Sequence, residues 1–359
     1  MKPHSLSPEF VDSPVQTRPY RVVQWATGNI GTHALRAVIE HPNLTLAGVY
    51  VHGADKAGRD AGELCGLPAT GVTATRSIED VVDTGADCVL YMPLACDLDE
   101  VCRLLASGIN VVTTRGEFHH PASMDPAVRA RVEAACEIGG TSIHSTGSSP
   151  GFITEAIPLV VTSIQRHLDS LVINEYADLS QRNSPQMLFD VMGFGHTPRM
   201  FDEARLSHAR SSFGPSLRLV AEALGLPLDS GEASGEVATA RGPVTIAAGT
   251  LEAGTVAAQR ITAAGMRHGV PLLSFRATWY CTTDLDPDWD VRATGWHVAV
   301  DGDAPLDIDI TMPVPLERMA AVSPGYTAHR AVNAVPFVCA AEAGIRTTPD
   351  LPQVIASLG

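Results

Sequence analysis

The chain has 359 residues, of which 45% are hydrophobic, 18% charged and 5% aromatic, and its formal net charge is −15 at pH 7. This composition is typical of a soluble globular protein, and the length allows two domains and a sizeable core. The negative charge is spread along the sequence, which argues against a nucleic acid or an anionic membrane surface as the partner.

Residues 1–19 are rich in Ser and Pro and lack the basic start and apolar core of a signal peptide. We expect them to form a disordered lead-in. No stretch approaches the roughly 20 apolar residues of a membrane helix, so a cytoplasmic location is predicted. The seven cysteines are odd in number and show no C-x-x-C spacing, which argues against a disulfide framework or a structural zinc site.

The segment from Tyr20 to Val51 has the pattern of a strand, a glycine turn, a helix over residues 32–40 and a second strand. Its turn resembles the glycine-rich turn that holds the pyrophosphate of a dinucleotide, although Ala26 stands where the first glycine is usual. A glycine lets the pyrophosphate approach the backbone, and the free N–H groups that open the helix attract its charge. The alternative is an ordinary tight turn. The predicted cofactor-binding residues are Thr27, Gly28, Asn29, Ile30 and Gly31.

The loop after the second strand indicates which dinucleotide is bound. An NAD site usually places a carboxylate at this strand end, whereas an NADP site offers cations to the 2′-phosphate. Here the strand end has no carboxylate and is followed by His52, Lys56 and Arg59, and Lys56 is one of only two lysines in the chain. We therefore expect these three residues to bind NADP, with NAD as the weaker alternative.

Strands and helices then alternate up to about residue 150, which predicts an N-terminal Rossmann domain with a doubly wound parallel sheet over residues 20–150. Ligands of such sheets bind beyond the carboxyl ends of the strands, so Pro93 and Thr114, in two of the loops there, are further predicted cofactor contacts. The predicted strands are 87–92, 109–113 and 141–145, and the predicted helices are 97–107 and 125–138.

A second domain, for substrate binding and dimerisation, is predicted over residues 151–325. Its long β-rich segments and one helical interval at 185–226 predict an α+β unit with an open, mixed and mostly antiparallel sheet. A last helix from Tyr326 to Ala343, in a C-terminal segment of residues 326–359, is expected to pack back on the Rossmann domain and to bring Asn333 near the cofactor. The predicted strands are 168–179, 236–248, 255–266, 272–282, 291–300 and 306–312.

Glu117 is the candidate catalytic residue, because it lies in the loop after a parallel strand, where the nicotinamide end of a cofactor is expected. A partly desolvated carboxylate at such a place suits proton transfer near neutral pH. An ordinary surface glutamate is the equally weighted alternative. Neighbouring His119 and His120 lack further ligands for a metal, and Cys136 falls on an apolar helix face rather than in a nucleophile's setting.

Pocket residues of the second domain are harder to choose, because aromatic residues in strands belong to the core more often than to a pocket. The candidates are Phe152, Tyr176, His196 and Trp279. The near-absence of lysine excludes two classes of mechanism. The only lysines are Lys2 and Lys56, so the rest of the chain has no lysine to donate a proton or to form a Schiff base.

The chain resembles the dihydrodipicolinate reductase-like superfamily, and within it the branch of 2,4-diaminopentanoate dehydrogenases and NAD(P)H-dependent amine dehydrogenases. The resemblance spans residues 20–345. It departs from true dihydrodipicolinate reductases, which carry a His-His-x-x-Lys stretch that is absent here. The motifs that carry the resemblance are WATGNIG (25–31), VHGADKAGRDAGELCG (51–66), YMP (91–93), VVTTRGEFHHP (111–121), STGSSPGF (145–152), GFG (193–195) and AHRAVNAVPFVCAAEAGI (328–345).

This resemblance implies a carboxylate in the loop after the fifth strand, matched by Glu117, although Gly116 stands where the family usually has a second acidic residue. It also implies a homodimer joined through the second-domain sheet. The predicted function is an NADPH-dependent amine dehydrogenase that condenses a small ketone or aldehyde with ammonia and reduces the iminium. The alternatives are a carbonyl or cyclic-imine reductase and a non-catalytic NADP-binding sensor.

Overall fold

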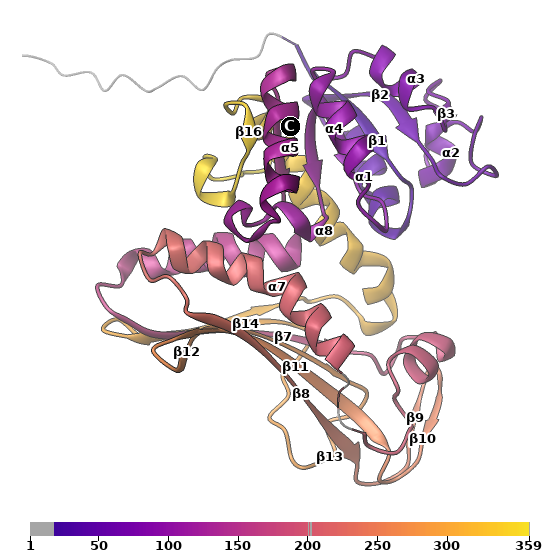
Figure 1. Cartoon of the computed structure of the whole chain (residues 1–359). Coiled ribbons are helices and arrows are strands. Elements are labelled where there is room, and N and C mark those ends of the chain that lie inside the picture. The colour runs from indigo at the N-terminus through magenta and orange to yellow at the C-terminus, as the bar shows by residue number, and fades with distance from the viewer. Residues whose placement is uncertain (1–17, 200, 202, 359) are drawn as a thin grey trace, which may run out of the picture.

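The computed structural model describes residues 18–199, 201 and 203–358. The expected disordered lead-in therefore lies, except for its last two residues, outside the described residues. An α/β domain sits above a large second sheet in the view of Figure 1, and helix α8 runs from the second sheet back into the first domain. No helix within the described ranges is both long and apolar enough to cross a membrane.

The first sheet has seven parallel strands in the order β16-β6-β5-β4-β1-β2-β3. The predicted doubly wound parallel sheet is confirmed. All four residues of β4 are buried, as expected for a strand covered on both faces. The strands are β1 (Tyr20–Trp25), β2 (Leu44–Tyr50), β3 (Ala74–Thr75), β4 (Cys88–Tyr91), β5 (Asn110–Thr113), β6 (Ser142–Ser145) and β16 (Gly344–Ile345).

Five α-helices cover this sheet before the chain leaves it, and three of them match the predicted helices to within three residues at each end. The two short helices α2 and α3 and the two-residue strands β3 and β16 were not predicted. The helices are α1 (Asn29–Glu40), α2 (Ala61–Cys65), α3 (Ile78–Asp83), α4 (Leu98–Ala106) and α5 (Pro126–Gly139), with the short turns η1 (Gly116–Phe118) and η2 (Pro121–Ser123) between α4 and α5.

An irregular helical connection leads into the second sheet, whose order is β13-β8-β11-β12-β7-β14-β15. Its pairs are antiparallel except for β12 and β7, so the predicted open mixed sheet is confirmed. The connection is η3 (Ser148–Ala156), α6 (Ile157–Val161) and η4 (Thr162–Ile164); the strands are β7 (Leu168–Asp178), β8 (Ser230–Ala240), β11 (Val256–Arg267), β12 (Val270–Tyr280), β13 (Leu285–Asp286), β14 (Gly295–Gly302) and β15 (Leu306–Thr311).

Helix α7 (Glu203–Ala223) lies on the side of this sheet that is turned toward the first domain (Figure 1). The single strand predicted over 236–248 is wrong, because β8 ends at Ala240 and a separate hairpin of β9 (Val244–Ile246) and β10 (Gly249–Leu251) follows. Arg241-Gly-Pro breaks the strand, since proline cannot donate a ladder hydrogen bond. A short helical segment, η5 (Gln186–Val191), precedes α7.

Helix α8 (Leu316–Cys339) begins ten residues before the predicted start. The predicted helix began after Ser323-Pro324-Gly325, but these three residues lie inside α8. A proline removes one hydrogen bond from a helix, a cost that packing offsets here. Ala328, Val332 and Val335 are fully or almost fully buried against α1, β4 and β5, so α8 shares a core with the first domain. The C-terminal turn η6 (Thr348–Asp350) follows β16.

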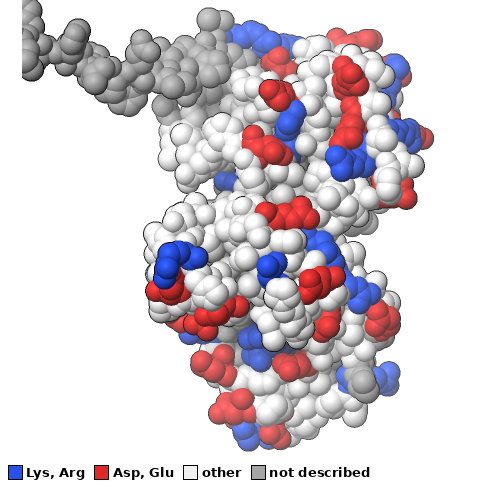
Figure 2. Space-filling view, turned by 60° about the vertical axis from the view of Figure 1, so that its left-hand side comes forward, with Lys and Arg blue, Asp and Glu red and all other residues white. Residues whose placement is uncertain are grey.

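Charged side chains of both signs are interspersed on the face drawn in Figure 2. Many pair locally, such as Arg129 with Glu133 at 2.8 Å on α5. This face therefore presents no broad basic patch of the kind that binds a nucleic acid.

Candidate active site

The turn between β1 and α1 has the backbone of a dinucleotide-binding turn. Ala26 has φ +70°, a left-handed conformation that glycine normally supplies, and the side chain of Gln24 holds it by donating to the Ala26 carbonyl oxygen at 2.9 Å. A Cβ atom on Gly31 would overlap that same carbonyl, whereas one on Gly28 would meet nothing within 4 Å. Gly31 therefore serves close packing, and Gly28 opens a free space above the start of α1.

This free space fits a dinucleotide pyrophosphate. No acidic residue lies in the first turn of α1, and its N-cap Gly28 makes no side-chain hydrogen bond, so the N–H groups of Asn29 and Ile30 are not capped by the protein's own side chains. Thr27 is tied to the first turn of α1, because its carbonyl oxygen accepts from Thr32 Oγ1 at 3.2 Å. The five predicted residues of the turn are thus brought together at the carboxyl edge of the sheet.

Beyond β2, the three predicted phosphate-binding cations are close by but are engaged with protein groups. Lys56 Nζ donates to the Thr27 carbonyl oxygen at 2.9 Å, and Arg59 forms an exposed ion pair with Glu63 at 3.5 Å. The His52 ring packs edge-on against Tyr50, with 5.2 Å between ring centroids.

Arg76 was missed by the sequence reasoning, although it lies at the same edge. It directly follows β3, whose last residue, Thr75, pairs in parallel with Tyr50 at the end of β2. Its charge is close enough to the Tyr50 phenol to lower the pKa of that group, against a larger rise from burial. Arg76 is exposed and has no ion-pair partner among residues 18–199, 201 and 203–358. The missed signal was a two-residue strand that places an arginine beside β2.

Glu117 lies in η1, directly beyond β5, and its carboxylate is anchored. Arg115 Nη2 contacts Glu117 Oε1 at 2.9 Å, and Arg115 Nη1 donates to the Leu94 carbonyl oxygen at 2.7 Å in the loop after β4. The charge of Glu117 also adds to the burial that raises the pKa of the Cys96 thiol to about 12. The candidate carboxylate therefore sits between the loops that follow β4 and β5.

Pro93 and Thr114 belong to these same two loops. The first lies two residues beyond β4 and is buried, and the second is the residue directly after β5. Met92 N donates to the Trp25 carbonyl oxygen at 3.1 Å, which ties the loop after β4 to the end of β1. Both predicted contacts are thus at the carboxyl edge, beside the turn.

The two histidines after Glu117 join the domains. His119 Nδ1 lies 2.6 Å from Glu155 Oε1, both side chains being fully buried, and His120 Nε2 lies 3.0 Å from Glu222 Oε2 on α7. Burial alone would raise the pKa of Glu155. The pKa is nevertheless lower than the ordinary value, because His119 lies in contact and because Ser216 and Thr348 donate hydrogen bonds to the carboxylate. The described residues contain no group of three or more His, Cys, Asp or Glu side chains placed to hold a metal ion.

A cleft of about 370 Å³ separates the first domain from the second sheet. Its walls come from the start of α1, the loop after β6, the ends of β7, β12 and β14, and the first half of α8. Of the predicted site residues, Asn29, Ile30, Tyr176 and Trp279 line it. A hydrogen bond of 2.6 Å between the hydroxyls of Ser148 and Thr327 closes one side and ties α8 to the connection η3.

Glu175 is the cleft residue that sequence reasoning missed. It lies on β7 opposite Trp296 of β14, whose indole Nε1 donates to Glu175 Oε2 at 2.8 Å. Burial raises the pKa of the Glu175 carboxyl, and the contacts from the side chains of Trp296 and Ser149 oppose that rise. No sequence pattern marks it, because a carboxylate within a strand normally indicates a solvent-facing position.

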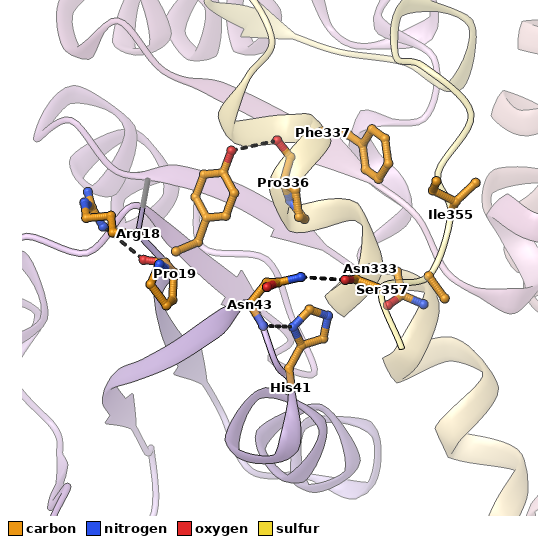
Figure 3. Close-up of a pocket in the computed structure, with 11 residues that line it drawn as sticks. Arg18, Pro19, His41, Asn43, Asn333, Pro336, Phe337, Ile355 and Ser357 are labelled. Carbon is orange, nitrogen blue, oxygen red and sulfur yellow. Dashed lines mark hydrogen bonds between the residues drawn. The ribbon is translucent and has the colours of Figure 1, made fainter. Parts of the chain in front are cut away.

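Three predicted site residues lie elsewhere. Asn333 lies in a pocket with His41, Asn43 and Ser357 (Figure 3), beside the residues that begin β1, at the amino edge of the sheet. The prediction for Asn333 is therefore wrong: Thr327, which lies earlier on α8, lines the cleft at the carboxyl edge instead.

His196 is exposed and lines a separate pocket with Phe189 and Gln259. Phe152 is not part of the cleft wall either. Its ring centroid lies 6.0 Å from that of Trp296, and Trp296 does line the cleft. Of the four candidate pocket residues, the structure thus brings two to the cleft and one directly behind it.

A Rossmann sheet with a free anion-binding turn, facing a cleft in a second domain, defines a nicotinamide dinucleotide-dependent oxidoreductase. Comparison with known proteins identifies the group. Residues 22–114 match the family model of the dihydrodipicolinate reductase N-terminus, and residues 152–359 match that of the 2,4-diaminopentanoate dehydrogenase C-terminal domain.

Three relatives agree with this match. An amine dehydrogenase of Streptomyces virginiae is 30% identical over 92% of this chain and 95% of its own length. A 2,4-diaminopentanoate dehydrogenase of Acetoanaerobium sticklandii is 23% identical over 79% of both chains. A solved amine dehydrogenase from Mycobacterium smegmatis has the same fold, with a TM-score of 0.73, 18% identity and coverage of 94% of this chain and 97% of that one. The chain belongs to the 2,4-diaminopentanoate dehydrogenase and amine dehydrogenase family of NAD(P)-dependent oxidoreductases, which act on CH–NH2 donors.

Proposed function

We propose that this protein is an NADPH-dependent amine dehydrogenase, which aminates a small ketone or aldehyde with ammonia and catalyses the reverse oxidative deamination. The observation that carries the proposal is the similarity to an amine dehydrogenase along almost the whole of both chains. The position of Glu117 supports it, because an anchored carboxylate stands at the edge where the dinucleotide turn opens.

Gly28, Asn29 and Ile30 would hold the pyrophosphate, and His52, Lys56, Arg59 and Arg76 would surround the 2′-phosphate. The nicotinamide supplies the hydride when the cofactor is bound. A cationic surrounding without a carboxylate at the end of β2 favours NADPH over NADH. Lys56 would continue to bridge the turn through Thr27, so its charge is available to both phosphate positions.

Glu117 would bind ammonium and move its protons. Arg115 contacts only Oε1, which leaves Oε2 for a second cation. The negative charge favours a cationic iminium over the neutral carbonyl compound, so it stabilises the species that must be present when reduction occurs. Arg115 fixes the direction of the carboxylate and lowers the entropy lost when ammonium binds.

Steady-state NADPH oxidation with a panel of short-chain ketones and aldehydes, with and without ammonia, tests this function. Ammonia-dependent turnover supports the amine dehydrogenase, and ammonia-independent turnover indicates a carbonyl or cyclic-imine reductase. Tight NADPH binding without any turnover indicates a sensor. Glu117→Gln should lower amination by roughly 10²–10⁴-fold, the range for a positioned acid or base, while NADPH affinity stays the same.

We also propose a homodimer joined through the second sheet. Figure 1 shows that α7 covers one face of this sheet, and among the described residues no α-helix covers the other face. Such a face is buried when two copies pack together. Light scattering at several protein concentrations should give twice the chain mass of 37.9 kDa. A monomer at all concentrations contradicts the dimer and leaves the proposed chemistry intact.

A further inference from the structure

The carboxyl of Glu175 is held in the interdomain cleft by the second sheet. Glu175 and Trp296 are directly paired neighbours on β7 and β14, and the 2.8 Å bond from the indole fixes Oε2. Tyr176, the next residue on β7, packs in a core with Leu188 and Phe194 and also lines the cleft. The same cleft reaches the start of α1, where the dinucleotide turn opens.

The surroundings of Glu175 keep it apart from other charges. Besides Glu175, the charged and titratable groups that line the cleft are Tyr176 and Asp178 on β7, Arg182 in the following loop and Tyr326 on α8. None of these forms an ion pair or hydrogen bond with Glu175 in the part of the chain that the structure describes. Burial thus dominates and raises the pKa of the Glu175 carboxyl, so it retains its proton to higher pH than an exposed glutamate does.

Reductive amination needs an acid as well as the group that binds ammonium. Ammonia first adds to the carbonyl carbon and gives a carbinolamine, whose hydroxyl must then leave. The C–O bond breaks with its electron pair going to oxygen, a proton joins that oxygen to form water, and the nitrogen lone pair forms the C=N bond of the iminium. One carboxyl cannot both stay ionised beside ammonium and donate this proton at the same moment, so two carboxyls with different environments suit the two tasks.

We propose that Glu175 is the general acid that protonates the departing hydroxyl of the carbinolamine. This inference rests on the proposed function. Glu175 becomes a carboxylate as the iminium forms, and its new negative charge then faces the new positive one. In the reverse direction the carboxylate accepts a proton from the water that attacks the iminium. Trp296 stabilises the carboxylate through its indole N–H and so positions the acid.

Glu175→Gln tests the proposal, because glutamine keeps the size and accepts the Trp296 bond but has no proton to donate at this step. The variant should lower ammonia-dependent turnover of a ketone by about 10²-fold. Reduction of a preformed cyclic imine, such as 1-pyrroline, involves no loss of water and should change by less than about threefold. Asp178→Asn, which removes a neighbouring carboxylate from the same cleft, is the matched control and should leave the ratio of the two rates unchanged.

A measurement without turnover gives a second readout. The 15N-labelled indole signal of Trp296, assigned with Trp296→Phe, should shift with pH as Glu175 ionises, with a midpoint above the ordinary glutamate value of about 4.3. The shift should disappear in Glu175→Gln. Wild-type amination should also fall at alkaline pH as this acid loses its proton, and the variant should lack that fall.

The outcomes separate this inference from the function on which it rests. Wild-type enzyme without ammonia-dependent turnover overturns the amine dehydrogenase proposal, and this inference with it. Suppose that the wild-type enzyme aminates normally. If Glu175→Gln then loses ketone amination and imine reduction to the same extent, or loses neither, only the role of Glu175 is overturned. An indole signal that does not respond to Glu175 overturns it as well.

Discussion

The carbonyl oxygen of Ala26 occupies the space that a side chain at Gly31 would need. This contact brings the start of α1 close to the end of β1, and it makes Gly31 a packing requirement of the fold. Gly28 lies only three residues before Gly31 but has open space above it. The two glycines of the turn therefore have different physical reasons to be glycine.

Gly31→Ala and Gly28→Ala form a matched pair that separates these reasons. Gly31→Ala should lower the free energy of unfolding by about 1–3 kcal/mol, the cost of overpacking. Gly28→Ala should lower it by less than about 1 kcal/mol but weaken dinucleotide binding at least about tenfold, because a methyl group enters the pyrophosphate space. Urea unfolding and cofactor titration of both variants provide the comparison. Normal cofactor binding by Gly28→Ala would show that the turn is purely structural.

A substitution at Ala26 is expected to raise the free energy of unfolding rather than lower it. Its φ of +70° costs an alanine roughly 1–2 kcal/mol, and glycine adopts this conformation freely. Glycine also has a more disordered unfolded state, which cancels about half of the gain. Ala26→Gly should therefore raise the free energy of unfolding by about 0.5–1 kcal/mol. A thermal unfolding scan measures it, and a lower melting temperature for the variant contradicts the assignment of strain.

The sequence predicted what local patterns encode and missed what strand pairing creates. Fully buried strands such as β4 and a helix after the glycine turn have local signatures, so the first sheet and the turn were predictable. The strand β3 has only two residues, too few for a pattern, and thus Arg76 was missed. Glu175 meets Trp296 only because strands 121 residues apart pair in register. The start of α8 was predicted too late, because Pro324 lies inside the helix and tertiary packing rather than local preference stabilises it.

Arg76 leads to a prediction about cofactor choice. Arg76→Ala should weaken NADPH binding by about 1–2 kcal/mol, or roughly 5–30-fold, and leave NADH binding almost unchanged, because only NADPH carries the 2′-phosphate. Arg59→Ala should act in the same direction, although Arg59 already pairs with Glu63. The control is Arg103→Ala, which removes an exposed arginine paired with Glu79 on neighbouring helices.

The two cofactors must be titrated on the same preparation for this test, and 2′-AMP and 5′-AMP serve as fragments that differ only in the phosphate position. Equal losses for NADPH and NADH would mean that Arg76 stacks on the adenine or supports the loop. An unchanged NADPH affinity would remove Arg76 from the site.

His144 determines part of the pH dependence of stability. It is fully buried at the end of β6, Nδ1 lies 2.8 Å from the Arg346 carbonyl oxygen, and burial lowers its pKa from 6.5 to about 4. As the pH falls below about 6.5, the unfolded chain binds a proton at this position and the folded chain does not, so stability is lost until the pH reaches about 4. The expected loss between about pH 7.5 and pH 5 is about 2 kcal/mol from this one group.

His144→Asn keeps a donor near the Arg346 carbonyl oxygen but cannot be protonated in this range, so the variant should lose about 2 kcal/mol less than wild type between these pH values. The control is His268→Asn, because His268 is exposed and has φ +53°, a conformation that asparagine tolerates. That variant should keep the wild-type dependence. Urea unfolding at both pH values measures the difference for all three proteins. If His144→Asn shows the same loss as wild type, the folded protein accommodates a charged His144, and the acid sensitivity has to come from another buried group such as Glu155 beside His119.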